Sequence, residues 1–114
     1  MLKQKYRFHS RGALNYLYKN ADSYRSKLFA MRTLRTNKQN PRFAVIVSKK
    51  VFKRAYGRNR MRRRVYEIIR SELPHLLMNQ DTALIIMTSE VMNVPYSELE
   101  DNIKQLMSQA CLYE

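Results

Sequence analysis

The 114-residue chain has very few of the residues that make linkers, cross-links or membrane spans. Two glycines and three prolines leave no room for a long flexible linker or a glycine-rich phosphate loop. A single cysteine, Cys111, cannot form an internal disulfide, so nothing indicates an oxidising compartment. The longest apolar runs have five residues, against about 20 for a membrane span, and residues 1–11 lack the apolar stretch of a secretory signal. We therefore expect one cytoplasmic domain that covers residues 1–114.

Acidic residues are almost absent from residues 1–66, where Asp22 is the only acid beside twenty lysines and arginines. Residues 67–114 hold eight acids and two basic residues, so the two parts carry net charges of +19 and −6. The density is highest in residues 49–64, with nine basic residues and no acid. Such a surface repels itself unless a polyanion neutralises it, and the commonest polyanion of matching density is a nucleic-acid backbone.

The spacing of apolar residues predicts a single α/β layer fold. In chain order we expect a helix over residues 10–19, strands over 27–34 and 42–48, a helix over 56–73, a strand over 83–88 and a final helix from 95 or 97. A further short strand fits between residues 21 and 27. Pro74 should end the second helix.

Local patterns predict finer features of these elements. Ser10 should be the N-cap of the first helix, and Ser97 and Glu100 match a capping box at the start of the last. The strand over 27–34 should carry Phe29, Met31 and Thr33 on one face and Ala30, Arg32 and Leu34 on the other. The continuous apolar run in 42–48 favours a central strand that is covered on both faces.

The helix over 56–73 is apolar on one side and basic on the other. A wheel places Met61, Val65, Ile68 and Ile69 in the apolar stripe, Asn59, Arg60, Arg63, Tyr66, Glu67 and Arg70 opposite, and Arg58, Arg62 and Arg64 on the flanks. A merely solvated face would carry acids at i±4, yet none occurs before Glu67. Guanidinium groups bind phosphate through two hydrogen bonds, and Asn59 can hydrogen-bond a base edge or a 2′-hydroxyl. Composition alone leaves RNA and DNA open.

Residues for protein-based catalysis are not gathered anywhere in the sequence. Glu98, Glu100 and Asp101 fall at the start of a helix, where the helix dipole already favours negative charge. His9, His75 and Cys111 have no partners at metal-ligand spacing. Gly57, just before Arg58, is interpreted as backbone freedom at the helix entry. We expect no catalytic residue and no metal site in the protein.

Residues 48–64 resemble the signature of a known family, the bacterial ribonuclease P protein subunit. The sequence Ser48-Lys49-Lys50-Val51 is followed, seven residues on, by Arg58-Asn59-Arg60-Met61-Arg62-Arg63-Arg64, and Arg7-Phe8 is similar to the family's N-terminal pair. The resemblance implies an α+β domain: a mostly antiparallel four-stranded sheet with three helices, like the second domain of a small-subunit ribosomal protein. It also implies a left-handed crossover between the strands over 42–48 and 83–88, against the usual preference.

The resemblance further implies the accessory subunit of a ribonucleoprotein endoribonuclease. Such a protein binds a catalytic RNA and the 5′ leader of precursor tRNA, and Mg²⁺ held mainly by the RNA carries out the cleavage. Its partners are therefore RNA, with no DNA and no membrane. The RNA-binding residues would be Lys49, Lys50, Lys53, Arg54, Arg58, Asn59, Arg60, Arg62, Arg63 and Arg64.

The implied leader-binding cleft, between the first helix and the sheet, maps less completely onto this sequence. The candidates are Leu14, Tyr18, Ala30, Arg32 and Tyr66. Leu14 and Tyr18 have the spacing at which the family commonly has two aromatics, Arg32 stands where an aromatic is frequent, and Tyr66 replaces a frequent arginine. Simple core packing is the alternative for Leu14 and Tyr18. The alternatives for the whole chain are a ribosomal-type structural RNA-binding protein and a DNA-binding regulator.

Overall fold

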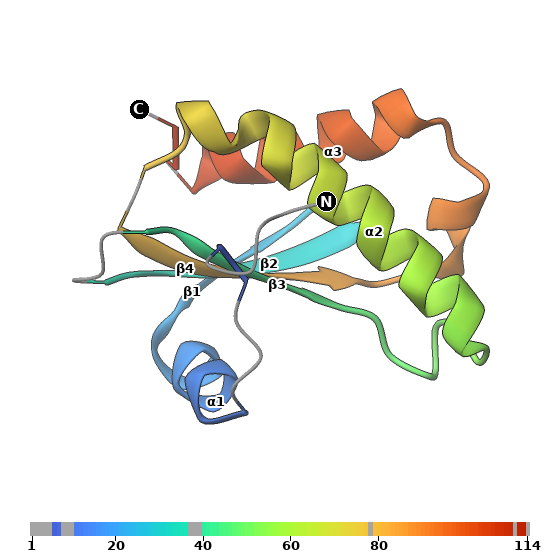
Figure 1. Cartoon of the computed structure of the whole chain (residues 1–114), viewed down its shortest axis with the longest axis horizontal. Coiled ribbons are helices and arrows are strands. Elements are labelled where there is room, and N and C mark those ends of the chain that lie inside the picture. The colour runs from blue at the N-terminus through green and yellow to red at the C-terminus, as the bar shows by residue number, and fades with distance from the viewer. Residues whose placement is uncertain (1–5, 8–10, 37–39, 78, 111, 114) are drawn as a thin grey trace.

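The computed structural model describes residues 6–7, 11–36, 40–77, 79–110 and 112–113. Its elements in chain order are α1 (Arg11–Asn20), β1 (Asp22–Arg25), β2 (Phe29–Arg35), β3 (Arg42–Ile46), α2 (Ala55–Glu72), β4 (Gln80–Ile86) and α3 (Tyr96–Gln109). Two short 3₁₀ turns, Leu73–His75 and Ser89–Met92, flank β4 in the sequence. The predicted element order is confirmed, including the short extra strand, which is β1 (Figure 1). Ser10 lies outside the described residues.

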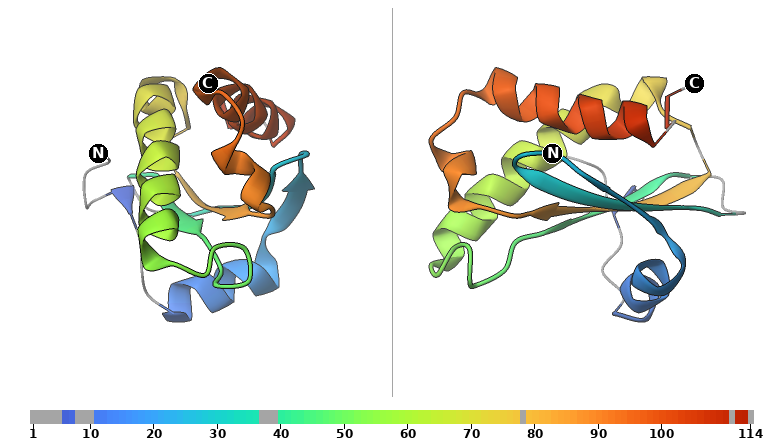
Figure 2. Two further views of the ribbon diagram at one scale, coloured as in Figure 1. Left: turned by 90° about the vertical axis from the view of Figure 1, so that its right-hand side faces the viewer. Right: turned by 180° about the vertical axis from the view of Figure 1, so that it is seen from behind.

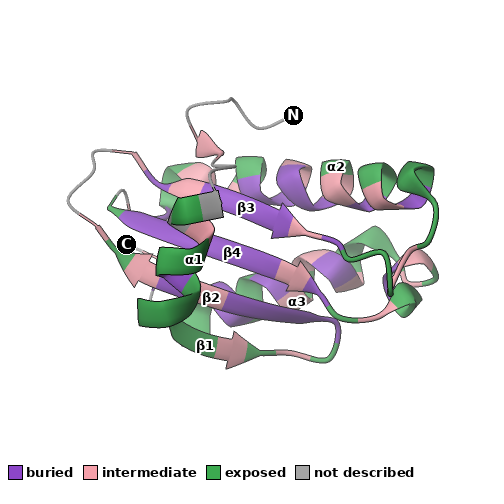
Figure 3. Cartoon of the chain, turned by 90° about the horizontal axis from the view of Figure 1, so that it is seen from below, coloured by how far each residue is buried: buried purple, intermediate pink, exposed green. Residues whose placement is uncertain are grey.

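The four strands form one mixed sheet in the order β1-β2-β4-β3. The pairs β1–β2 and β2–β4 are antiparallel, and β3–β4 is parallel, with Val45 opposite Leu84. In Figure 3, β3 lies above β4, both strands run in the same direction, and α2 lies behind the sheet. The β3–α2–β4 connection is therefore left-handed, as the resemblance implied and against the usual preference.

The helices divide between the two faces of the sheet. Figure 2 shows α2 and α3 on one face and α1 on the other. The main core lies under α2 and α3 and includes Phe29, Met31 and Phe43, all fully buried. A smaller cluster under α1 is made by Leu17, Ala44 and Ala83, with Leu14 and Leu34 packed against it. The predicted alternation of the two faces along β2 is thus confirmed, because Phe29 and Met31 lie on the opposite side from Leu34.

The prediction that residues 42–48 form a central strand is wrong, because β3 is at the edge of the sheet. Its residues are nevertheless largely buried. Arg7 forms a parallel bridge to Phe43 on the outer edge, and the Val45 amide donates a hydrogen bond to the Tyr66 hydroxyl group (3.3 Å). These two contacts, together with the helices on both faces, give an edge strand the apolar sequence of a central one.

The last helix begins earlier than the predicted capping box requires. Pro95 is the N-cap of α3, and its carbonyl accepts hydrogen bonds from the amides of Glu98 and Leu99. No side chain caps this end, so the Ser97–Glu100 capping box is wrong: Ser97 already lies inside the first turn. The apolar stripe that docks α3 is as predicted at Leu99, Ile103 and Leu106, which are fully buried.

Candidate nucleic-acid interface

The loop between β3 and α2 is braced from both ends by residues of the Ser-Lys-Lys and Arg-Asn-Arg segments. At its start, the Ser48 carbonyl accepts from the amides of Val51 (3.2 Å) and Phe52 (3.1 Å). At its end, Arg58 Nη1 donates to the carbonyls of Phe52 (2.8 Å) and Lys53 (3.0 Å). The spacing between the two segments therefore has a structural cause: Arg58 must reach back over one turn of loop.

Gly57 makes room for this loop. It is buried in the first turn of α2, where a Cβ atom would lie 3.3 Å from Phe52 Cδ1. That separation is tighter than ordinary van der Waals contact. The glycine thus allows the Phe52 ring to pack against the helix. This close approach replaces the predicted role of Gly57 as a source of backbone freedom.

The nine basic residues of the stretch 49–64 have no carboxylate partners among the described residues. The ion pairs of the described residues all lie outside this stretch: Arg42 with Asp81, Arg70 with Glu67, and Lys104 with Glu100. Six of the nine are exposed: Lys49, Lys50, Lys53, Arg54, Arg60 and Arg63. The first turn of α2 also lacks an acid, so the positive end of the helix dipole adds to these charges. The arrangement suits a polyanionic ligand.

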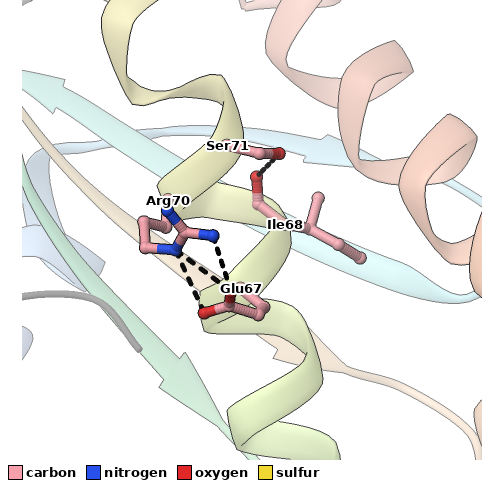
Figure 4. Close-up of polar contacts among 4 residues, drawn as sticks. All are labelled: Glu67, Ile68, Arg70 and Ser71. Atoms are coloured by element: carbon pink, nitrogen blue, oxygen red, sulfur yellow. Dashed lines mark hydrogen bonds and ion pairs between the residues drawn. The ribbon is translucent and has the colours of Figure 1, made fainter.

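One exposed stripe of α2 carries Tyr56, Arg60 and Arg63 and continues to Glu67 and Arg70, at the i+3 and i+4 spacing of one helix face. The stripe changes character at Glu67, which accepts three hydrogen bonds from Arg70 at 2.7–3.2 Å (Figure 4). Arg70 lowers the pKa of Glu67 to about 2, so the carboxylate is ionised at neutral pH. Because this pair neutralises itself, the net positive part of the stripe ends at Arg63.

The remaining motif side chains are engaged by the protein itself. Arg62 Nη1 donates to Asn59 Oδ1 (3.0 Å), which orients the amide that was predicted to contact RNA. The Arg64 guanidinium lies 6.0 Å from the centre of the Tyr96 ring on α3, at the outer range of a cation–π contact. Arg58 braces the loop. The structure thus distinguishes motif side chains that contact other parts of the protein from exposed ones such as Arg63. The sequence pattern alone does not make this distinction.

On the opposite face of the sheet, two of the predicted leader-binding residues come together. Arg32 on β2 donates to the Tyr18 carbonyl (3.0 Å), and its guanidinium lies 5.2 Å from the centre of the Tyr18 ring. Burial raises the pKa of the Tyr18 phenol, although the ring remains 37% exposed. Leu14 is half-buried against the small cluster under α1, and Ala30 is buried. Tyr18 and Arg32 therefore form an aromatic–cation pair beside α1.

Tyr66 does not join this group. The wheel placed it on the exposed side of α2, but only 2% of its surface is accessible, so that prediction is wrong. Its ring lies in the main core under α2, on the other face of the sheet from α1, with the Arg7 guanidinium 5.8 Å from the ring centre. Burial raises the pKa of its hydroxyl group. Tyr66 is a structural residue that covers the edge of β3.

No cluster of three metal-binding side chains occurs among the described residues. Two of the carboxylates are paired with arginines: Asp81 with Arg42 in two hydrogen bonds (2.7 and 3.0 Å), and Glu67 with Arg70. His9 and Cys111 lie outside the described residues. No described helix has the length and apolar character that a membrane crossing needs.

Tyr56 is a feature of the interface that the sequence analysis missed. It is 65% exposed on the stripe with Arg60, whose Nη1 donates to the Tyr56 hydroxyl group (3.4 Å). The available signal was its position four residues before Arg60, which places both side chains on one face of the helix.

Comparison with known proteins places the chain in a family. The family model described as Ribonuclease P matches residues 2–111. The chain belongs to the ribonuclease P protein family, and the predicted resemblance is confirmed.

Individual relatives carry the same family name. The chain is 47% identical over 58 residues to the ribonuclease P protein component of Chloroflexus aurantiacus, a match that covers 51% of this chain and 43% of the relative's length. It is 30% identical over 112 residues to that of Pseudanabaena sp. and 28% identical over 126 residues to that of Cyanothece sp.. Each of the latter two matches covers 96% of this chain and 95% of the relative.

Solved structures share the fold. The RNase P protein of Staphylococcus aureus superposes with a TM-score of 0.85 at 19% identity, over 96% of this chain and 98% of that protein. The RNase P protein of Thermotoga maritima gives a TM-score of 0.82 at 21% identity, over 90% and 96% of the two chains. These likenesses confirm the predicted α+β fold with its mixed four-stranded sheet.

Proposed function

We propose that this chain is the protein subunit of ribonuclease P, the endoribonuclease that removes the 5′ leader from precursor tRNA. In this proposal the loop before α2 and the exposed stripe of α2 bind the catalytic RNA. The face of the sheet beside α1 contacts the leader. The protein assists the reaction and supplies none of the reacting groups.

The observation that carries the proposal is the set of unpaired cations on the braced loop and α2. Nine basic residues occur in sixteen positions with no carboxylate partner among the described residues, in a chain that matches the ribonuclease P family over residues 2–111. Hydrogen bonds already fix the loop, so little further ordering is needed when RNA neutralises these charges.

The proposed leader contact rests on Tyr18 and Arg32. A half-exposed aromatic ring next to a guanidinium group offers one surface for base stacking and one donor set for phosphate. Leu14 is half-buried against the small cluster under α1 and Ala30 is buried, so Tyr18 is the more exposed candidate. Tyr18→Ala should weaken binding of precursor tRNA by about 1–3 kcal/mol and leave binding of mature tRNA unchanged. Equal losses of affinity for precursor and mature tRNA would show that Tyr18 acts through packing and not through contact with the leader.

The magnesium ions of the proposed reaction fit the RNA better than the protein. Magnesium prefers several oxygen ligands, and the described residues offer no group of three or more metal-binding side chains. Asp81 and Glu67 are in addition bonded to arginines. We therefore propose that the RNA holds the ions, and we assign no metal ligand among the described residues.

The experiment that tests the proposal is precursor-tRNA cleavage at low magnesium by the ribonuclease P RNA of the same genome. Addition of the protein should raise the rate of leader removal, and a Lys49→Ala/Lys50→Ala/Arg63→Ala variant should raise it less. The matched control is Lys104→Ala, which removes a cation on α3 far along the chain from the basic stretch. If the wild-type protein gives no stimulation, the proposal is wrong. Sequencing of RNA bound to the protein in lysate then tests the ribosomal alternative, which predicts a majority of ribosomal RNA.

A further inference from the structure

Tyr56 is the most exposed of the large hydrophobic residues in the described part of the chain. Its accessible fraction is 65%, close to the 63% of Tyr16 on α1 and above the 43% of Met87 and the 40% of Tyr96. A single exposed tyrosine is ordinary on a protein surface. The surroundings of Tyr56 distinguish it from Tyr16, since it lies in the first turn of α2, two residues after the exposed cations Lys53 and Arg54.

The Tyr56 ring and the Arg60 guanidinium are linked. Arg60 Nη1 donates to the Tyr56 hydroxyl group (3.4 Å), while the other guanidinium N–H groups have no acceptor among the described residues. Arg60 can therefore bind a phosphate while its orientation is set by Tyr56. Arg63, one turn further along the same stripe, is also exposed and has no partner among the described side chains.

We propose that Tyr56 stacks on an unpaired nucleobase of the bound RNA and holds Arg60 toward a phosphate of the same strand. The proposal rests on the proposed function and adds to it a base-contacting residue outside the Arg-Asn-Arg segment. An exposed aromatic ring within a positively charged, acid-free surface is the combination that binds single-stranded nucleic acid. A planar ring that ends in a hydroxyl group serves both purposes, because the face stacks and the edge accepts from the arginine.

Stacking and charge neutralisation differ in their salt dependence. A lost stacking contact weakens binding equally at every salt concentration, whereas a lost phosphate contact also flattens the dependence of affinity on salt. Arg60 keeps its charge and its reach in Tyr56→Ala, so this variant should weaken binding to the ribonuclease P RNA about 5- to 150-fold with an unchanged salt slope. Tyr56→Phe keeps the ring and should remain within about threefold of the wild type. Neither change should lower thermal stability, since the side chain is 65% exposed.

The chain contains no tryptophan, which allows a direct test of stacking. Tyr56→Trp should bind the ribonuclease P RNA as the wild type does, and its single indole fluorescence should be quenched in the complex. Tyr16→Trp is the matched control, because Tyr16 is 63% exposed but lies on α1, and its fluorescence should not change with an RNA that has no leader.

The outcomes separate this proposal from the one on which it rests. If Arg63→Ala weakens binding while Tyr56→Ala binds like the wild type, or while the indole at position 56 is not quenched, stacking is wrong and the proposed function stands. A fall in melting temperature for Tyr56→Ala would also overturn stacking, because it would give the ring a structural role. If the wild-type protein does not bind the RNA, both proposals fail together.

Discussion

Replacement of Arg58 by alanine should affect the protein differently from replacement of Arg63, although both belong to the same basic segment. Arg58 donates to two loop carbonyls, whereas Arg63 is exposed and has no partner among the described residues. The structure thus predicts that Arg58 acts mainly on the shape of the loop and Arg63 mainly on the bound phosphate.

The magnitude follows from the two hydrogen bonds of Arg58. A hydrogen bond to a charged group contributes about 1.5–3 kcal/mol when it is buried, and less when it is open to solvent. The contact with Phe52 is part-buried and the contact with Lys53 is exposed, so we expect a loss of about 1–2 kcal/mol in the free energy of unfolding. For a domain near 100 residues this lowers Tm by roughly 4–8 °C per kcal/mol.

Two measurements on each variant distinguish the roles. Calorimetry should show a lower Tm for Arg58→Ala and an unchanged Tm for Arg63→Ala. Binding to the ribonuclease P RNA over a range of salt concentrations should show a flatter slope for Arg63→Ala, by about 0.7–0.9 for each lost phosphate contact. Arg58→Ala should weaken binding at all salt concentrations because the loop is less ordered. If Arg58→Ala has the Tm of the wild type and flattens the salt dependence of binding as Arg63→Ala does, then Arg58 does not act by stabilising the loop.

Three further predictions concern stability and titration. Tyr66→Phe leaves the Val45 amide without its acceptor and should cost about 1–2 kcal/mol in urea unfolding; an unchanged midpoint would contradict the role of Tyr66 at the β3 edge. Glu67 should titrate near pH 2 by NMR instead of its ordinary 4.5, and Arg70→Ala should move the midpoint upward. The stabilisation from this lowered pKa is complete above about pH 4.5 and is lost as the pH falls through about 2. Leu17→Ala should cost about 2–4 kcal/mol and raise amide exchange in α1 first, since Leu17 is 1% exposed beneath that helix; uniform exchange across the sheet would argue against local release.

The sequence predicted those features of the fold that depend on periodicity along one element. The alternation of Phe29, Ala30, Met31 and Arg32 assigned the two faces of β2, because successive side chains of a strand point in opposite directions. The apolar stripe of α2 was predicted for the same reason, with the helical period in place of the strand period.

Features that depend on neighbouring elements were not predictable in this way. The edge position of β3 was missed because Arg7 and Tyr66, far away in the sequence, cover the edge and allow the strand to be apolar. Tyr66 was misplaced because the wheel assumes that a helix buries one stripe, whereas α2 also packs against the side of β3. The start of α3 near residue 95 was predicted correctly, but the Ser97–Glu100 capping box was not, because Pro95 is the N-cap and Ser97 falls within the first turn.

For the interface, the sequence predicted which residues lie in the basic segment. It did not predict which of them hold the loop and which are exposed to a ligand. That Arg58 turns back to two carbonyls, and that Asn59 is held by Arg62, depends on the path of the loop. That path is set by Phe52 against Gly57, a contact with no sequence pattern of its own.

The covered edge of β3 has a consequence for the protein before it meets any RNA. An open edge strand invites pairing with another chain and is a common route to aggregation. Here one edge is occupied by Arg7 and Tyr66, and the opposite edge is β1, a strand of only four residues with Asp22 and Arg25 exposed at its ends. As far as the structure describes it, the sheet therefore offers no long apolar edge to a second molecule, which disfavours pairing of this sheet with that of a neighbour.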